Sequence, residues 1–217
     1  MLTFSFANPS DQLNDFVINY HYSHLYPHGT DIAFRTDING RLVGVCLFGH
    51  TGGNPKAACI LKGYDDPLQY RELTRLVLRD AVQKNSESQF IGWCLRWLQH
   101  NRPDLVGVIS FSDPKYGHTG GVYRASNWDY LGLQKPDRPH LIINGEDLHP
   151  RACLHKYGTS SPVKLRASGL DVKEVDRIPK HCYAYILKSE LKEDLKYTVQ
   201  KFNPKKAVTR CLKQSSI

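Results

Sequence analysis

The sequence lacks the features that mark secreted, membrane-spanning and zinc-binding proteins. No pair among its six cysteines has the Cys-x-x-Cys spacing of a zinc ribbon or a redox dithiol. The N-terminal stretch MLTFSFANPSDQ has no basic region followed by a long apolar segment, and no apolar run approaches membrane-spanning length. We therefore expect a cytoplasmic protein with no membrane partner, whose cysteines are buried, reduced thiols.

Internal repeats and low-complexity tracts are also missing, while the composition is that of a folded, basic protein. Apolar residues make up 41% of the 217 residues, enough for the core of one domain with appendages. The 29 Lys and Arg residues exceed the 21 Asp and Glu residues, which gives a formal net charge of +8. Such a surplus favours a polyanionic partner such as nucleic acid, although many basic proteins are merely soluble.

The hydrophobic pattern, in which strands alternate with helices, predicts a layered α/β domain. A helix-period stripe follows Ser86, a predicted N-cap, and the continuous apolar run at 105–111 is typical of a strand buried on both faces. The other expected elements are a helix at 11–20, a hairpin around Asn39-Gly40, a strand at 71–79, short strands around Asn144-Gly145 and a strand at 181–187.

The C-terminal part is expected to differ from the rest. Residues 1–187 are predicted to form a single catalytic domain, followed at 188–217 by an appendage. Within it, residues 189–202 suit a helix, and NPKKAVTRCLKQSSI reads as a basic tail. Such a tail can follow phosphates, but a solvated terminus is the simpler interpretation.

Three polar residues are candidates for catalysis. Asp113 follows the buried strand, at the end where α/β sheets bind their ligands. Tyr123 comes ten positions later, past a glycine-rich turn, and Arg75 lies within the strand at 71–79. A long cation in an apolar strand needs a partner or a path to solvent. The alternative is an Arg75–Asp113 salt bridge that only stiffens the sheet.

A second group of candidates could bind a metal. Histidines and tyrosines crowd residues 21–28, and one more histidine follows Asp113. Imidazole, phenolate and carboxylate together suit iron better than zinc or magnesium. The alternative is a set of solvated loop histidines. The histidines and neighbouring tyrosines of this group are His21, Tyr22, His24, Tyr26, His28 and His118.

A third group suggests contact with a nucleic-acid base. Aromatic residues cluster after Tyr123, at Trp128 and Tyr130, with Arg124 and Asn127 among them. An enzyme that acts on a base in duplex DNA extrudes the base and stacks it on aromatic or apolar walls. The alternative is that Trp128 belongs to the core.

Several of these segments together resemble phage Mom proteins. The likeness extends to about residue 187, and its central third is the most specific part. The matching segments are ELTRL (72–76), NSESQFI (85–91), SFSDP (110–114), GHTG (117–120), YRASNW (123–128), His21-Tyr22 and the stretch from Arg151 to YGT at 157–159.

The resemblance implies a GNAT-like fold, with a central mixed sheet flanked by helices, and a DNA-modifying activity. Mom proteins convert adenine in double-stranded DNA to N6-(methylcarbamoyl)adenine, which protects phage DNA from host restriction nucleases. By this likeness Arg75, Asp113 and Tyr123 would be essential, and acetyl coenzyme A would be a donor or cofactor. The helix start at Ser86, Glu87 and Ser88 is then the expected cofactor-binding segment.

Two observations complicate that expectation. Ordinary GNAT enzymes hold the coenzyme pyrophosphate in a glycine-containing loop, whereas the corresponding DAVQKNS at 80–86 has no glycine. The implied product also joins N6 to a CH2 carbon, whereas acetyl transfer would join it to a carbonyl carbon. Activating such a carbon is usually the work of a cofactor. We therefore hypothesise an iron site formed by His21, Tyr22, Asp113 and His118.

Two other functions remain open at this point. The first is a conventional acetyl-coenzyme-A-dependent N-acetyltransferase that acts on a small molecule or a protein. The second is a basic DNA-binding protein without catalytic activity. Nucleoside mass spectrometry of DNA from expressing cells would separate all three.

Overall fold

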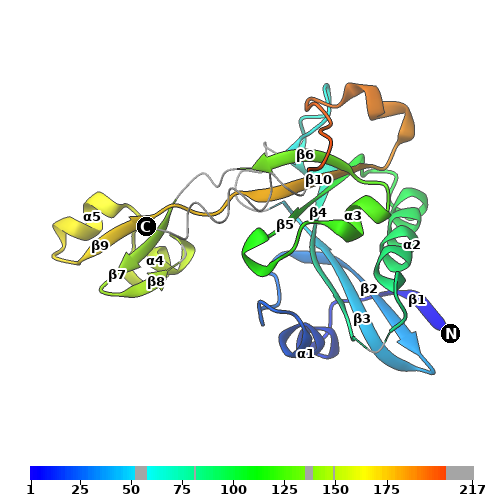
Figure 1. The fold of residues 1–217 in the computed structure, drawn as a ribbon, viewed down its shortest axis with the longest axis horizontal. Coiled ribbons are helices and arrows are strands. Elements are labelled where there is room, and N and C mark those ends of the chain that lie inside the picture. The colour runs from blue at the N-terminus through cyan, green and yellow to red at the C-terminus, as the bar shows by residue number, and fades with distance from the viewer. Residues whose placement is uncertain (52–57, 81, 135–138, 149, 204–217) are drawn as a thin grey trace.

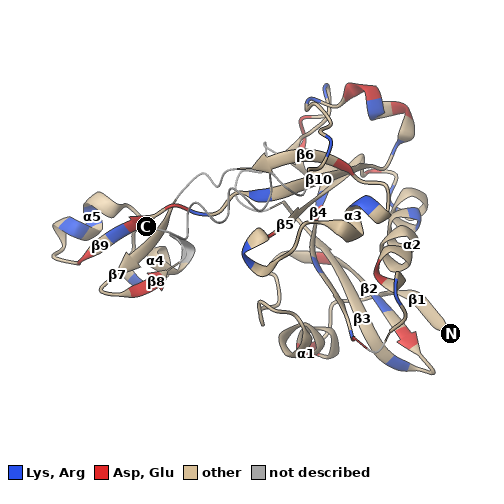
Figure 2. Ribbon diagram, in the orientation of Figure 1, with Lys and Arg blue, Asp and Glu red and all other residues tan. Residues whose placement is uncertain are grey.

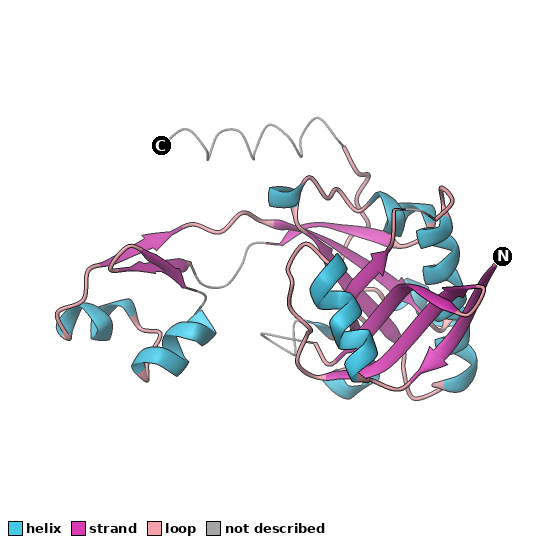
Figure 3. Cartoon of the chain, turned by 90° about the horizontal axis from the view of Figure 1, so that it is seen from below, coloured by secondary structure: helices cyan, strands magenta, loops and turns pink. Residues whose placement is uncertain are grey.

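The chain forms a main body around one large sheet and a smaller lobe that projects from one side (Figure 1). The computed structural model describes residues 1–51, 58–80, 82–134, 139–148 and 150–203. The large sheet has seven strands in the order β1-β2-β3-β4-β5-β10-β6. Helices cover both faces of this sheet (Figure 3). The predicted fold class, a mixed sheet flanked by helices, is therefore confirmed.

The first four strands form an antiparallel meander. They are β1 (Leu2–Ala7), β2 (Thr30–Ile38), β3 (Arg41–Gly49) and β4 (Tyr70–Leu78). Asn39 and Gly40 join β2 to β3 with φ angles of 50° and 75°, as a type I′ turn requires. The predicted hairpin and the predicted strand at 71–79 are both confirmed.

Two helices cover opposite faces of these strands. Helix α1 (Asp11–Tyr20) packs Leu13, Phe16 and Val17 onto one face. Helix α2 (Ser86–Asn101) covers the other face with the predicted stripe from Phe90 to Leu98. Its start differs by one residue from the prediction, because Ser86 is already helical and the N-cap is Asn85.

The second half of the sheet begins with a parallel pair of strands, while the other pairs among the described strands of this sheet are antiparallel. Strand β5 (Gly107–Ser112) runs parallel to β4, and the register extends only from Tyr70–Gly107 to Glu72–Ile109. Strand β10 (Lys180–Ile186) then lies antiparallel between β5 and β6 (Asp129–Gln134). Between β5 and β6 come the 3-10 helix η3 (Pro114–Tyr116) and the short helix α3 (Gly121–Ala125).

The small lobe lies between β6 and β10 in the sequence. Its three antiparallel strands have the order β8-β7-β9, and two helices pack on them around Leu141, Cys153 and Leu165. The sequence pattern predicted short strands here but not a separate core. The elements of the lobe are β7 (His140–Ile143), β8 (Glu146–Leu148), α4 (Pro150–Tyr157), α5 (Pro162–Ala167) and β9 (Val172–Val175).

The predicted helix at 189–202 is wrong. The 3-10 helix η4 (Ser189–Asp194) is followed by non-helical chain up to residue 203. The backbone N–H groups of Lys196 and Gln200 donate to the carbonyls of Ile60 and Tyr130. Because these hydrogen bonds join the segment to other parts of the body, they replace the bonds that a helix would make within itself. The basic tail from residue 204 lies outside the described residues.

The cysteines are placed as expected. All five that lie in the described part of the chain are buried and free of disulfide bonds, and Cys211 lies outside it. Among the described residues, no helix combines the length and the apolar character needed to cross a membrane.

The loop before α3 depends on a close approach between Gly120 and Tyr183. Gly117 and Gly120 have similar φ angles of 75° and 72°, but a Cβ atom at Gly120 would overlap the Tyr183 ring, whereas Gly117 faces open space. Both alanine variants share the left-handed strain. We expect Gly120→Ala to lower the free energy of unfolding by about 1–3 kcal/mol more than Gly117→Ala, as measured by urea denaturation. Equal losses would contradict this packing.

Candidate active site

A pocket of about 340 Å³ lies where β4 and β5 part. Its walls come from both strands, from the loop and helix start at 117–123, and from His21 and Tyr22. This volume is near the lower end of the roughly 300–1,000 Å³ typical of ligand pockets. Arg75, Asp113 and Tyr123, the three predicted catalytic residues, all line it.

The pocket exists because β4 bends away from β5. Opposite β3, the register of β4 shifts between Arg75 and Leu73, so Thr74 is the extra residue of a β-bulge. The Thr74 hydroxyl donates to the carbonyl of Leu47 on β3 at 3.1 Å. Bulges bend a strand and redirect its side chains, and they are common beside active sites. Here the bulge sits directly before Arg75.

Ser110 fills the opening between the two strands. Its Oγ lies 2.8 Å from the Leu73 carbonyl oxygen and 2.8 Å from the Tyr123 hydroxyl. A carbonyl can only accept, and serine has one hydroxyl proton, so Ser110 donates to Leu73 and accepts from Tyr123. This chain of bonds fixes the phenol of Tyr123 and satisfies a carbonyl that the parted strands would leave unpaired.

Tyr123 contributes a neutral phenol to the pocket. Burial raises its pKa well above the usual range, so it carries its proton at neutral pH. Its ring packs between Trp128 and Tyr183, with ring centroids 5.1 Å away on both sides. The ring therefore belongs to the core, and the hydroxyl group is the part suited to chemistry.

Arg75 is held by backbone carbonyls. Its Nε donates to Leu25 at 3.2 Å, and its Nη1 donates to Thr74 at 2.6 Å. Burial lowers the pKa of Arg75, but a guanidinium remains charged at neutral pH. Asp113 does not form the salt bridge with Arg75 that was the alternative interpretation. It pairs with Lys180 instead.

Asp113 lies at the end of β5 and caps η3. Its Oδ1 accepts from the Lys115 backbone N–H at 3.0 Å, and its Oδ2 pairs with the Lys180 ammonium at 3.0 Å. Its own carbonyl accepts from the backbone N–H groups of Tyr116 and His118. The carboxylate is thus fixed by its own turn and faced by a cation from β10.

His21, Tyr22 and His118 line the pocket together with Asp113, so the residues of the iron hypothesis lie near one another. The His21 Nδ1 accepts from the Ser23 backbone N–H at 3.1 Å, which places the proton of the neutral ring on Nε2. Burial, and then the Asp113 carboxylate, raise the pKa of the Tyr22 phenol.

The described part of the chain contains no group of three or more His, Cys, Asp or Glu side chains placed to hold a metal ion. The predicted iron site therefore finds no support in the geometry. Another histidine of the same loop, His24, donates a hydrogen bond from its Nδ1 to the carbonyl of Ile18 at 2.7 Å.

The predicted base-binding residues are not pocket-lining residues. Trp128 is only 5% exposed and packs in the core, which was the alternative interpretation. Arg124 donates to the Thr119 carbonyl and the Tyr183 hydroxyl, and its guanidinium lies 3.8 Å from the centre of the Phe202 ring. Asn127 adopts a left-handed backbone conformation with φ of 63°. These residues hold the body of the protein together.

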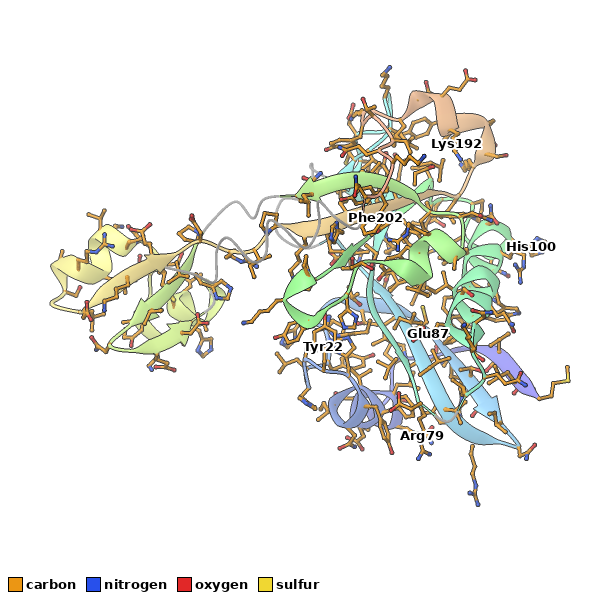
Figure 4. The ribbon with its side chains drawn as sticks, viewed as in Figure 1. Tyr22, Arg79, Glu87, His100, Lys192 and Phe202 are labelled. Atoms are coloured by element: carbon orange, nitrogen blue, oxygen red, sulfur yellow. The ribbon has the colours of Figure 1, made fainter. Side chains whose placement is uncertain are left out.

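A second pocket of about 360 Å³ adjoins the first at the start of α2. It is lined by the predicted cofactor-binding residues Ser86, Glu87 and Ser88, and by the cations Arg79 and Lys84. No side chain caps the first turn of α2. Uncapped N–H groups at a helix start favour a bound anion. Figure 4 shows Glu87 at this end of α2 and Arg79 at the end of β4.

Sequence reasoning missed two residues that complete the site. Ser110 lay within the SFSDP segment, but only the parting of β4 and β5 shows why a hydroxyl is needed there. Lys180 precedes the predicted strand at 181–187, and its partner Asp113 becomes apparent only from the β5–β10 pairing.

The family comparison settles which proteins this chain is related to. The sequence profile of the Mom protein family matches residues 6–205. The chain belongs to the Mom protein family. Within the family, it is 33% identical over 149 residues to the methylcarbamoylase Mom of Escherichia phage Mu. That match covers 68% of this chain and 61% of the phage Mu protein.

Solved structures similar to this Mom family chain are N-acetyltransferases. One from Staphylococcus aureus Mu50 has a TM-score of 0.48 and 13% identity, covering 86% of this chain and 98% of its own. The ribosomal-protein-S18-alanine N-acetyltransferase of Escherichia coli has a TM-score of 0.49 and 8% identity, with 87% and 95% coverage. A putative GNAT-family acetyltransferase from Desulfovibrio desulfuricans has a TM-score of 0.49, 9% identity, and coverage of 87% and 100%.

The buried imidazole of His21 predicts a loss of stability in acid. Burial, followed by the Arg75 charge, lowers its pKa from 6.5 to about 4. Between these two values the unfolded chain binds more protons than the folded one, so the free energy of unfolding falls as the pH falls. His21→Asn keeps an acceptor for the Ser23 N–H but does not titrate. Urea denaturation should therefore show a shallower pH dependence for the variant across this window, and parallel curves would contradict the assignment.

Proposed function

We propose that this chain modifies adenine in double-stranded DNA by attaching the methylcarbamoyl group to N6, and so protects phage DNA from restriction. The observation that carries the proposal is the meeting of Arg75, Asp113 and Tyr123 on one pocket in a chain of the Mom family. Identity with a methylcarbamoylase supports the reaction type.

The pocket suits the chemistry of N6. The amino group of adenine is a weak nucleophile because its lone pair is delocalised into the ring, so a base that removes a proton during attack would assist it. Asp113 is the pocket carboxylate that would accept this proton, with Lys180 beside it at 3.0 Å. Tyr123 would hold the base or donor through its neutral hydroxyl, and Arg75 would bind an anionic group.

The charge of the chain suits a DNA substrate. The net charge of +8 favours association with a polyanion. Lys and Arg residues occur on both the main body and the small lobe (Figure 2). An adenine in duplex DNA must leave the base stack to reach a pocket of this kind.

The pocket at the start of α2 would hold the donor or a cofactor. The first-turn N–H groups of Ser86, Glu87 and Ser88 would bind an anionic group such as a pyrophosphate, assisted by Arg79 and Lys84. Acetyl coenzyme A, the cofactor implied by the family resemblance, has such a group.

The first test removes single functional groups from the pocket. Asp113→Asn keeps the hydrogen bond to the Lys115 N–H but removes the base, and Tyr123→Phe removes the hydroxyl that donates to Ser110. We expect Asp113→Asn to lower the content of modified adenine in DNA from expressing cells by at least about 100-fold, and Tyr123→Phe and Arg75→Lys to lower it as well. Nucleoside mass spectrometry measures the product.

A matched control exists for the Asp113 variant. Asp66 also precedes a proline and caps a 3-10 helix, η2 (Pro67–Gln69), by accepting from the Leu68 N–H, but it does not line the pocket. Asp66→Asn should leave the product unchanged. If each of the three single variants, Asp113→Asn, Tyr123→Phe and Arg75→Lys, still modified adenine fully, the proposed site would be refuted.

Coenzyme binding is a separate prediction. Titration calorimetry with acetyl coenzyme A should show saturable binding that Lys84→Ala weakens and added salt weakens further, because the contact is ionic. Lys62→Ala, at an exposed lysine away from this pocket, is the control. Absence of binding to the native chain would remove this coenzyme from the proposal.

The same pocket also favours a second function, conventional N-acetyl transfer to a small molecule or protein. That function predicts coenzyme binding without any mass change in DNA. Acetylated nucleoside, methylcarbamoyl nucleoside and unchanged DNA differ in mass, so one measurement distinguishes the alternatives.

A further inference from the structure

The mouth of the active-site pocket carries a cluster of aromatic rings. Tyr22 follows α1, and Tyr116 ends η3, so the two lie far apart in the sequence. Their ring centroids are 4.4 Å apart. His21 and His118 extend the cluster, with ring centroids 4.1 and 5.1 Å from Tyr22. In Figure 4, Tyr22 lies next to the loop that carries η3.

Of these rings, the two tyrosines are exposed, unlike Trp128. Tyr22 is 44% exposed and Tyr116 is 49% exposed. Leu25, whose carbonyl holds Arg75, is 66% exposed beside them in sequence. Exposed apolar surface gathered at one place, as opposed to scattered singly, marks a binding site.

One cation lies over an exposed ring, and two more lie nearby, at the pocket and at Asp113. The Lys115 ammonium lies 5.9 Å from the centre of the Tyr116 ring, and Lys180 and Arg75 lie at the pocket. Flat rings with cations beside them are the surface that proteins use for unpaired nucleotides, because any base stacks on a ring and the cations attract its phosphate. A protein partner would not require cations among the rings.

We propose that Tyr22 and Tyr116 form a stacking wall for an adenine extruded from DNA, and that this wall holds the base at the mouth of the pocket. The proposal rests on the proposed function in taking DNA as the substrate. Because the two rings already touch, the base stacks on the outer side of the pair, where it displaces the Lys115 ammonium from the Tyr116 ring, and is not inserted between them.

The wall is joined to the catalytic carboxylate through one short turn. The Tyr116 backbone N–H donates to the Asp113 carbonyl at 3.2 Å, and the His118 N–H donates to the same oxygen at 3.3 Å. Asp113 and Tyr116 therefore keep a fixed spacing. A base stacked on Tyr116 would present its edge to a carboxylate that the same turn positions.

The test compares two single-stranded probes with the full chain. One is a fluorescein-labelled 12-nucleotide oligodeoxyadenylate, and the other has abasic sites in place of every adenine, so the phosphates are equal. Fluorescence anisotropy should show that Tyr116→Ala and Tyr22→Ala weaken binding of the adenine probe by at least about five-fold, while binding of the abasic probe changes less than about two-fold.

Conservative variants separate the ring from its hydroxyl group. Tyr116→Phe and Tyr22→Phe should bind the adenine probe as the native chain does, because they keep the ring. Tyr197→Ala, an exposed tyrosine remote from the pocket in sequence and not part of its lining, is the control and should bind both probes normally. Circular dichroism and the thermal midpoint establish that each variant is folded.

Two results would overturn the wall. One is an equal loss of affinity for the adenine probe and the abasic probe in the alanine variants. The other is an equal loss of affinity for the adenine probe in the phenylalanine and alanine variants. Cellular product separates this proposal from the proposed function. Base-dependent binding without modified adenine would refute the function and leave the wall, whereas normal modification by Tyr22→Ala and Tyr116→Ala would refute the wall and leave the function.

Discussion

Beyond Glu72 and Ile109, β4 and β5 no longer pair, and the backbone groups that face the opening need other partners. The Ser110 hydroxyl supplies one of them for Leu73 and receives the Tyr123 phenol in turn. An unsatisfied buried carbonyl would cost about 1–3 kcal/mol, so this single hydroxyl allows the strands to part at moderate cost. The opening then admits polar groups from both strands.

The pocket is nearly neutral although the chain is strongly basic. Burial keeps His21 and Tyr22 uncharged, and the cations Arg75 and Lys180 offset the carboxylates Asp113 and Glu87. The net charge of +8 must therefore lie outside the pocket. This separation suits a nucleic-acid substrate, whose phosphates are charged but whose bases are not.

Sequence patterns predicted the helices and strands whose buried side chains recur at a regular spacing along the chain. The strand at 71–79 and the stripe of α2 follow from periodic burial, and Asp113 follows from its place after a buried strand. The segment at 189–202 has a helical composition, yet its N–H groups bond to distant carbonyls, which no local pattern reveals. Trp128 and Tyr116 show the same limit, because burial of the one and exposure of the other depend on which loops meet in space.

The small lobe enters and leaves the main body at neighbouring points. Gln134, the last residue of β6, is the cross-strand partner of Lys180, the first residue of β10, so the lobe occupies the place of a hairpin loop. Loop-closure entropy grows only slowly with length, and the sheet therefore tolerates inserts of very different size there. A lobe of another length at this place would leave the pairing of β6 with β10 unchanged.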